Sequence, residues 1–355
     1  MSSIIPIQGK SSTSKSLFDT IFNTFYICRA TMDYILLHHC GGIGKWQWKK
    51  ALFAVILFYS ASYPLFITVF TTYAPNHRCF VEYCDATTND TIEASWISLA
   101  IPKQDSSSSS SNFLGQKRAY DSCHMYHRIE GNEECLDTSF RRDNVSDCIQ
   151  YIYDDYYFDE TLATKYDLVC DFEYKTQLLN SLLMLGLLIG SFIGGRLGDK
   201  FGRKNTMFWA NLIIVPCILV SAFVPNFGAY AFLRWITCVC IAITWVNSTV
   251  YMLELFVPQG RKYVFLLQDL PVYTFVLALV TYVSRDWTTI HYGIAIFCST
   301  FIPTWFFLPE SPRWLAQNKK HEEAFEVNIL NYTFLESSKQ ALFNDTTNSS
   351  VQTYF

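Results

Sequence analysis

Six stretches of about 20 residues that carry almost no charge constrain this chain more than any other feature. Such a segment can cross a lipid bilayer as an α-helix, because a helix satisfies its own backbone hydrogen bonds. The fourth stretch contains Arg234 and Glu254 and the fifth contains Asp269, so these two match the pattern less closely. We therefore predict an all-α membrane protein with six transmembrane helices, at Ala51–Thr71, Thr176–Gly195, Thr206–Val224, Phe232–Phe256, Val264–Val283 and Thr289–Leu308.

The composition agrees with a membrane protein and argues against nucleic-acid binding. Half of the 355 residues are hydrophobic, 17% are aromatic and only 16% are charged, whereas soluble domains average about 25% charged residues. The formal net charge is -4, and no block of basic residues stands alone to neutralise phosphates. We expect a lipid bilayer, and no nucleic acid, among the partners.

Basic residues in the short flanking segments predict the orientation. They gather before the first span, between the second and third, and between the fourth and fifth, which all lie on one side of the membrane. The segment before the first span is too long and too polar for a signal peptide. We expect a multi-pass plasma-membrane protein with a cytosolic N-terminal segment (1–50), a first span (51–71), an extracellular loop (72–175), five further spans (176–308) and a cytosolic segment (309–355).

The predicted extracellular loop contains cysteines and glycosylation signals. An even number of cysteines in an oxidising compartment predicts three disulfides and leaves their pairing open. Asn89 and Asn144 each begin a glycosylation tripeptide, whereas similar tripeptides at Asn331 and at Asn247 lie in cytosol or membrane and are expected to stay unmodified. The cysteines expected in disulfides are Cys79, Cys84, Cys123, Cys135, Cys148 and Cys170.

Glycines and charges cluster in the connection between the second and third spans, from Gly195 to Lys204. The glycines permit close approach and positive φ, and charges at a membrane edge need partners. We predict that ion pairs hold the cytosolic end of the bundle closed and break when it opens. The alternative is that the basic residues only anchor the topology. The predicted gate and motif residues are Gly195, Asp199, Gly202, Arg203, Lys204, Glu254, Arg261, Glu310 and Arg313.

Two local patterns predict packing and a helix start. Gly186, Gly190 and Gly194 recur every four residues, which gives a helix a smooth face for a tightly packed neighbour. After the last span, Ser311 followed by Pro312 is typical of a helix N-cap and first helical position.

The segment Pro309-Glu310-Ser311-Pro312-Arg313-Trp314-Leu315 resembles the signature of the organic cation and anion transporter family of the major facilitator superfamily. The connection from Gly195 to Lys204 resembles the loop between the second and third helices of that superfamily. The resemblance covers roughly 44–331 and implies a twelve-helix carrier in which two six-helix bundles rock around a central cavity. We expect this chain to be the N-terminal half, a fragment or truncated product, with a second half or a full-length carrier as partner.

The resemblance also implies a substrate. By position, Trp245 corresponds to an aromatic residue that contacts cations in this family, and an aromatic face suits an ammonium ion; packing is the alternative. Asp269 needs either a cationic substrate or a bond to Arg261 or Lys262. We predict transport of small organic ions, organic cations before anions or zwitterions, with no catalysis, cofactor or metal. The competing hypothesis is a non-transporting membrane protein that binds or regulates a full-length carrier.

Overall fold

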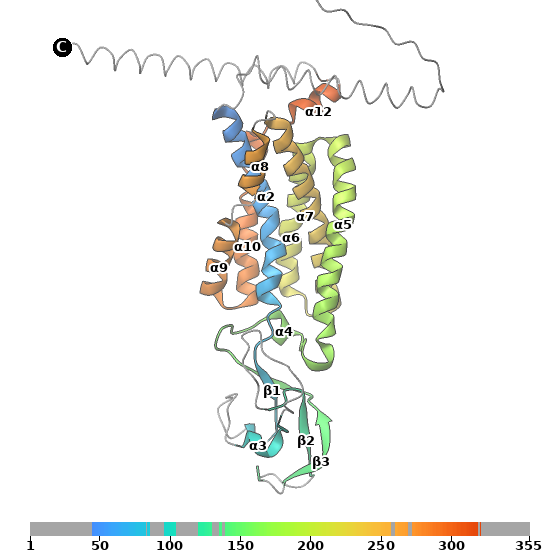
Figure 1. Cartoon of the computed structure of the whole chain (residues 1–355), viewed down its shortest axis with the longest axis vertical. Helices are drawn as coiled ribbons and strands as arrows, with labels where there is room; N and C mark the ends of the chain where they lie inside the picture. Colours follow the sequence, from blue (N-terminus) through green and yellow to red (C-terminus); the bar gives the residue numbers. More distant parts are fainter. Residues whose placement is uncertain are drawn as a thin grey trace, which may run out of the picture.

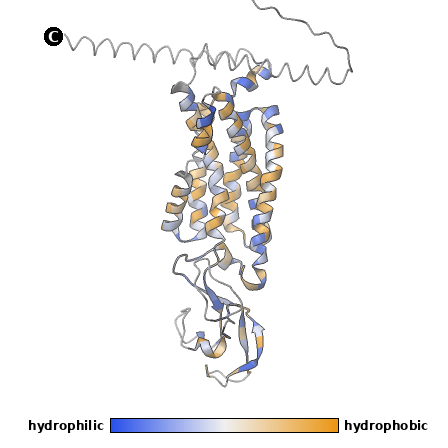
Figure 2. Cartoon of the chain, viewed as in Figure 1, coloured by the Kyte–Doolittle hydropathy of each residue, from blue (hydrophilic) through white to orange (hydrophobic). Residues whose placement is uncertain are grey.

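The computed structural model describes residues 45–82, 84–85, 96–103, 120–129, 135–136, 139–256, 260–268, 272–318 and 320. Long helices form a bundle, with a small β-containing segment at one end and α12 at the other (Figure 1). Hydrophobic residues are abundant in the bundle, and hydrophilic residues are frequent in the β-containing segment (Figure 2). The elements are α2 (Lys45–Thr71), β1 (His77–Cys79), α3 (Ile97–Ala100), β2 (His124–Arg128), β3 (Phe140–Asp147), β4 (Tyr151–Tyr153), α4 (Leu162–Lys165), η3 (Cys170–Phe172), α5 (Tyr174–Phe201), α6 (Arg203–Phe223), α7 (Phe227–Leu255), α8 (Arg261–Gln268), α9 (Val272–Ser284), α10 (Trp287–Ser299), α11 (Thr304–Phe307) and α12 (Pro312–Gln317).

Five helical stretches in the described residues are long and apolar enough to cross a membrane. They match the predicted spans one to four and six. The predicted span Val264–Val283 is instead described as two shorter helices, α8 and α9, and 269–271 between them lie outside the described residues. The sequence has Pro271 at this point, and proline cannot donate a backbone hydrogen bond. The five stretches are Gln47–Thr71, Cys170–Phe201, Arg203–Phe223, Phe227–Leu255 and Trp287–Phe307.

Helix α7 is the centre of the bundle and packs against α2, α5 and α6. The predicted glycine stripe makes the contact with α5 close. A Cβ added to Gly190 would lie 2.3 Å from the carbonyl oxygen of Val239, and one added to Gly194 would lie 2.8 Å from the Cα of Ile243. These distances are too short for any side chain, so the stripe brings the two helix backbones together, as the four-residue spacing predicts.

A proline inside α2 joins that helix to α10. Pro64 lacks the N–H that would otherwise donate to the carbonyl oxygen of Ser60. The Sγ of Cys298 in α10 donates to this carbonyl at 3.0 Å. A carbonyl without a donor is costly in an apolar bundle, so the thiol satisfies the group and holds two helices together. Cys298 is one of the free cysteines among the described residues, with Cys217, Cys238 and Cys240.

The segment between α2 and α5 is built from two strand pairs and three disulfides. Antiparallel β1 and β4 form one pair, and antiparallel β2 and β3 form the other. The buried Arg78 and Asp85 form an ion pair at 2.7 Å, and the guanidinium lies over the ring of Trp96. The prediction of three disulfides is confirmed, and the pairs are Cys79–Cys148, Cys84–Cys135 and Cys123–Cys170.

The connection between α5 and α6 is much shorter than the sequence suggests. Helix α5 continues past Gly195 to Phe201, and only Gly202 separates it from Arg203, the first residue of α6. Gly202 has a φ of 98°, in the left-handed region that favours glycine. Asp199 and Arg203 are therefore on different helices that meet at a single-residue hinge.

Candidate functional site

Helix α12 lies at one end of the bundle (Figure 1). Charged side chains from α5, α6 and α7 meet there, next to the segment that begins α12. The Nη2 of Arg203 is 2.6 Å from Oδ1 of Asp199 and 3.6 Å from Oε1 of Glu254. The side chain of Asp199 is 70% exposed, whereas that of Glu254 is only 16% exposed. Because screening by water weakens exposed pairs, the pair with Glu254 is the stronger constraint on the helices.

Glu254 also connects α7 to the segment before α12. The hydroxyl of Ser311 donates to Oε2 of Glu254 at 2.5 Å, and the guanidinium of Arg313 interacts electrostatically with the same carboxylate. The hydroxyl of Tyr251, one turn earlier in α7, donates to the carbonyl of Pro309 at 3.1 Å. Ser311 is the N-cap of α12 and accepts from the backbone N–H of Trp314, which confirms the predicted helix start.

Glu310 joins the N-terminal ends of α6 and α12. Its Oε1 accepts from the backbone N–H of Lys204 and from that of Ser311, each at 3.0 Å. A carboxylate is favoured at a helix N-terminus because the first N–H groups have no partner within the helix. The carboxylate packs so closely on Gly202 that a Cβ there would lie 2.4 Å from its Oε2.

The glycines of the motif have different roles in the structure. A Cβ added to Gly198 would lie 1.7 Å from Oδ1 of Asn247, so α5 and α7 can approach only because no side chain is present. A Cβ added to Gly195 would meet nothing within 4 Å. The predicted close approach is therefore wrong for Gly195, which lies on an open part of α5, and confirmed for Gly198 and Gly202.

The remaining basic residues of the predicted gate lie around this cluster. The Nζ of Lys204 lies 4.6 Å from the ring centroid of Trp305, a cation–π geometry. The Nε of Arg261 donates to the carbonyl of Leu253 at 3.2 Å. The indole N–H of Trp314 donates to the carbonyl of Asp199 at 2.9 Å, which links α12 to α5. The structure thus gathers these groups at one end of the bundle.

Trp245 lies on the partly exposed face of α7 toward α2. Its indole N–H donates to the hydroxyl of Ser62 at 3.0 Å, and its ring stacks on Phe58 with centroids 5.7 Å apart. Thr249, one turn later, accepts from the side-chain amide of Gln268 in α8 at 2.8 Å. Asp269, the predicted cation partner, lies outside the described residues.

The packing roles of several buried polar residues in the spans escaped sequence analysis because no motif predicts their partners. Asn211 in α6 accepts from the hydroxyl of Ser60 at 2.8 Å and donates to that of Thr244 at 3.2 Å, so one amide joins three helices. Asn247 donates to the carbonyl of Gly194 at 2.9 Å and accepts from Nη1 of Arg203 at 3.5 Å. The glycine stripe of α5 is the sequence signal that could have indicated Asn247, because a helix face without side chains needs the side chains of a neighbouring helix to pack against it.

Arg234 is fully buried within α7. Its Nη2 donates to the carbonyl of Pro64 at 2.5 Å and to the hydroxyl of Thr68 at 2.6 Å. Its Nε and Nη1 have no acceptor among the described residues. No carboxylate in the described part of the chain pairs with Arg234, and a buried charge without such a partner is costly.

Comparison with known proteins now identifies the family. A family model described as "Sugar (and other) transporter" matches residues 123–341. The chain belongs to this family. Solute carrier family 22 member 10 of Homo sapiens is 27% identical over 300 residues, which are 82% of this chain and 54% of that protein. Solute carrier family 22 member 6-B of Xenopus laevis is 30% identical over 295 residues, which are 81% and 51% of the two chains.

Both relatives are members of solute carrier family 22, and this chain is similar to them over about four fifths of its length. The chain spans about half the length of the curated relatives it matches. Among solved structures, the partially occluded inward-open xylose transporter XylE from E. coli is similar, with 18% identity, a TM-score of 0.41 and coverage of 49% of each chain. Membership of a transporter family and the apolar helices together make this a multi-pass membrane protein.

Proposed function

We propose that this chain forms the N-terminal bundle of a plasma-membrane carrier that moves small organic ions by alternating access, with α12 and the chain's N-terminal segment on the cytosolic side. The observation that carries the proposal is the Arg203 cluster, in which one guanidinium contacts Asp199 before the hinge and Glu254 on α7. Contacts of this kind between helices can be made in one state and broken in another.

The cluster would act as a latch on the cytosolic end. Arg203 is mostly buried, and its partner Glu254 also receives the hydroxyl of Ser311. Opening this end must separate α7 from α6 or from α12, which breaks at least one of these contacts. Water that enters the gap then hydrates the charges of Arg203 and Glu254. This hydration offsets part of the free energy that is lost when their ion pair breaks.

The preferred substrate of the proposed carrier is an organic cation. Trp245 and Phe58 stack on the side of α7 that faces α2, and Trp245 remains partly exposed. Aromatic faces attract ammonium groups through their quadrupole. Glu254 of the latch lies more than two helical turns after Trp245 on α7, so latch and substrate contact can be altered separately.

An organic anion is the second candidate, and Arg234 favours it. Two of its donor atoms, Nε and Nη1, have no acceptor among the described residues, and its full charge lies inside the bundle. A positive charge without a carboxylate raises the electrostatic potential of the bundle interior, which attracts anions and repels cations. The buried charge of Arg234 bears on whether the substrate is an anion or a cation, and on no other property of the substrate.

Uptake by cells that express the full chain tests the proposal. We expect uptake of a labelled quaternary ammonium compound above that of mock cells, and less uptake of a labelled aromatic carboxylate. Trp245→Ala should reduce uptake of the cation. The opposite preference would favour the anion hypothesis and point to Arg234. Absence of uptake, together with co-purification of the chain with a full-length family 22 carrier, would favour the non-transporting partner that the sequence left as an alternative.

The latch itself is tested with Glu254→Gln, which removes the charge and keeps the shape. A cysteine placed at Thr206, which is buried one turn after Arg203 in α6, reports cytosolic access through its rate of reaction with a membrane-impermeant maleimide. We expect the rate to rise by about tenfold, equivalent to roughly 1.4 kcal/mol, with a smaller rise for Asp199→Asn because that carboxylate is mostly exposed. Glu173→Gln, an exposed carboxylate before α5, is the matched control. An unchanged rate in Glu254→Gln would leave only topological anchoring.

A further inference from the structure

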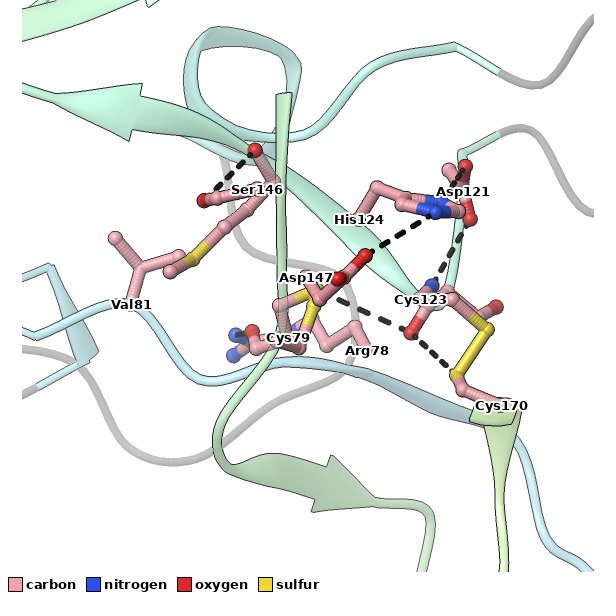
Figure 3. Close-up of a disulfide and its surroundings, with 12 residues drawn as sticks. Arg78, Cys79, Val81, Asp121, Cys123, His124, Ser146, Asp147 and Cys170 are labelled. Carbon is pink, nitrogen blue, oxygen red and sulfur yellow. Dashed lines mark hydrogen bonds and ion pairs between the residues drawn. A yellow bond between two sulfur atoms is a disulfide. The ribbon is translucent and has the colours of Figure 1, made fainter. Parts of the chain in front are cut away.

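The Cys123–Cys170 disulfide differs from the other two in its place and exposure. It joins the residue before β2 to the η3 turn directly before α5, so it ties the β-containing segment to a membrane helix (Figure 3). Both of its cysteines are partly exposed, whereas each of the other two disulfides joins a buried cysteine, Cys79 or Cys84, to a partly exposed one. Exchange requires direct attack on a sulfur, so a thiol reductant can attack either sulfur of Cys123–Cys170 but only one sulfur of each other disulfide.

A histidine lies beside this disulfide with a defined orientation. The Nδ1 of His77 in β1 lies 3.1 Å from the carbonyl oxygen of Pro75. A carbonyl can only accept, so Nδ1 carries the hydrogen and Nε2 presents a lone pair. That Nε2 is 3.8 Å from Sγ of Cys170. A backbone carbonyl that fixes the tautomer in this way is the usual support of a metal-binding histidine.

We propose that His77, Cys123 and Cys170 form a thiol-dependent site for a soft divalent metal such as Zn²⁺, open to the metal only when the disulfide is reduced. A ring nitrogen of His77 and the two Sγ atoms all lie within 4.8 Å of one another. Ligands around one tetrahedral Zn²⁺ lie roughly 3.5–3.8 Å apart, so a small movement of the side chains is enough. One nitrogen and two thiolates are a donor set that Zn²⁺ prefers over Mg²⁺ or Ca²⁺.

The chemistry balances with a low-molecular-weight thiol as the reductant. Two thiol molecules break the S–S bond and form their own disulfide, delivering two electrons and two protons to the sulfurs of Cys123 and Cys170. Zn²⁺ then binds both sulfurs as thiolates and releases the two protons to solvent. His77 enters as a neutral imidazole, and water completes the fourth position.

The site lies where it can control the start of α5. Cys170 has a φ of 52°, a left-handed conformation that is uncommon for a residue with a side chain. The disulfide helps to hold this conformation, and reduction alone would release the tie to β2. Zn²⁺ bound to the two sulfurs and to β1 would restore a tie between the same segments.

Metal binding to the purified full chain in detergent tests the proposal. The chain is stripped of metal with a chelator, titrated with glutathione and alkylated, and the modified cysteines are mapped by mass spectrometry. We expect Cys123 and Cys170 to be alkylated before Cys79 and Cys148. After this mild reduction, Co²⁺ should give a thiolate-to-metal charge-transfer band at one equivalent, and Zn²⁺ should displace it; the oxidised chain should give no band.

Two histidine variants decide the assignment of the ligands. His77→Ala should weaken Zn²⁺ binding to the reduced chain by at least about tenfold. His124→Ala is the matched control, because His124 follows Cys123 but pairs with Asp121 at 2.8 Å, and its binding should equal that of wild type. A disulfide map of oxidised His77→Ala that still contains Cys123–Cys170 shows that the variant folds; if the map is changed, His77→Gln replaces it. Equal affinity of the His77 variant and wild type, earlier opening of Cys79–Cys148, or no binding by the reduced wild type would overturn the proposal.

Discussion

At the scale of single residues, Gly202 determines how α5 meets α6. Its φ of 98° reverses the chain within one residue, and the carboxylate of Glu310 occupies the space where a Cβ would lie. The backbone conformation and the contact with Glu310 therefore both disfavour a side chain at Gly202. The backbone excludes residues with side chains, and the contact fixes the segment before α12 against the start of α6.

We predict that Gly202→Ala lowers the free energy of unfolding by at least about 1–2 kcal/mol, the cost of a left-handed conformation for a residue with a Cβ. Gly195→Ala is the control, because a Cβ there meets nothing within 4 Å and alanine favours helix over glycine. Thermal unfolding of both variants in detergent, followed by tryptophan fluorescence, measures the difference. Equal stability of Gly202→Ala and wild type would contradict the assigned hinge.

At the scale of elements, the start of α10 depends on a capping carboxylate outside the span. Asp286 accepts hydrogen bonds from the backbone N–H groups of Thr288 and Thr289 and from both of their hydroxyls. Burial raises the pKa of Asp286, but these hydrogen bonds outweigh burial and hold its pKa below the usual value of 3.8. The ionised cap therefore favours the folded chain.

A depressed pKa in the folded chain contributes stability that is present above the unfolded pKa and is lost as the pH falls through the folded pKa. We predict that Asp286→Ala destabilises the chain by about 1 kcal/mol at pH 7. The difference in stability between Asp286→Ala and wild type should shrink as the pH falls below 3.8, the usual pKa of this carboxyl group. Thermal unfolding at several pH values measures the difference, with the exposed Asp155→Ala as control. A gap between Asp286→Ala and wild type that stays constant to the lowest pH would rule out the ionised cap.

The elements also show where sequence reasoning succeeds. Long apolar stretches predict helices well because a membrane leaves few alternatives, and five of the six predicted spans coincide with helical stretches long and apolar enough to cross one. The glycine stripe predicted close packing, but nothing in the sequence says that α7 is the neighbour. The cysteine count predicted three disulfides, whereas the pairing of Cys123 with Cys170 depends on the path of the whole segment. Asn211 and Arg234 are single polar residues in apolar stretches, and their partners come from distant helices.

At the scale of the whole molecule, the two ends of the bundle carry different chemistry. The strands lie at one end and α12 lies at the other (Figure 1). The three disulfides belong to the strand-containing end, and the Arg203 cluster contacts the segment that begins α12. Disulfides persist in an oxidising compartment, and basic residues in short connections favour the cytosol. Both arguments give the chain the same orientation, although they rest on residues of opposite ends.

Glycosylation of Asn144 tests this orientation. Asn144 is exposed in β3, at the disulfide end, so an oligosaccharyltransferase in the secretory pathway can reach it only if this end faces the lumen. We predict that the chain from mammalian cells loses mass on treatment with a peptide N-glycosidase and that Asn144→Gln loses part or all of this shift.

Asn247 is fully buried in α7 and bonds to Gly194, so glycopeptide mapping should find it bare. The second predicted signal, Asn89, and Asn331, which the sequence predicts on the cytosolic side, lie outside the described residues, and we expect a glycan on the first and none on the second. A glycan on Asn331 with Asn144 unmodified would reverse the orientation, and the Arg203 cluster would then be a latch on the outer end of the bundle.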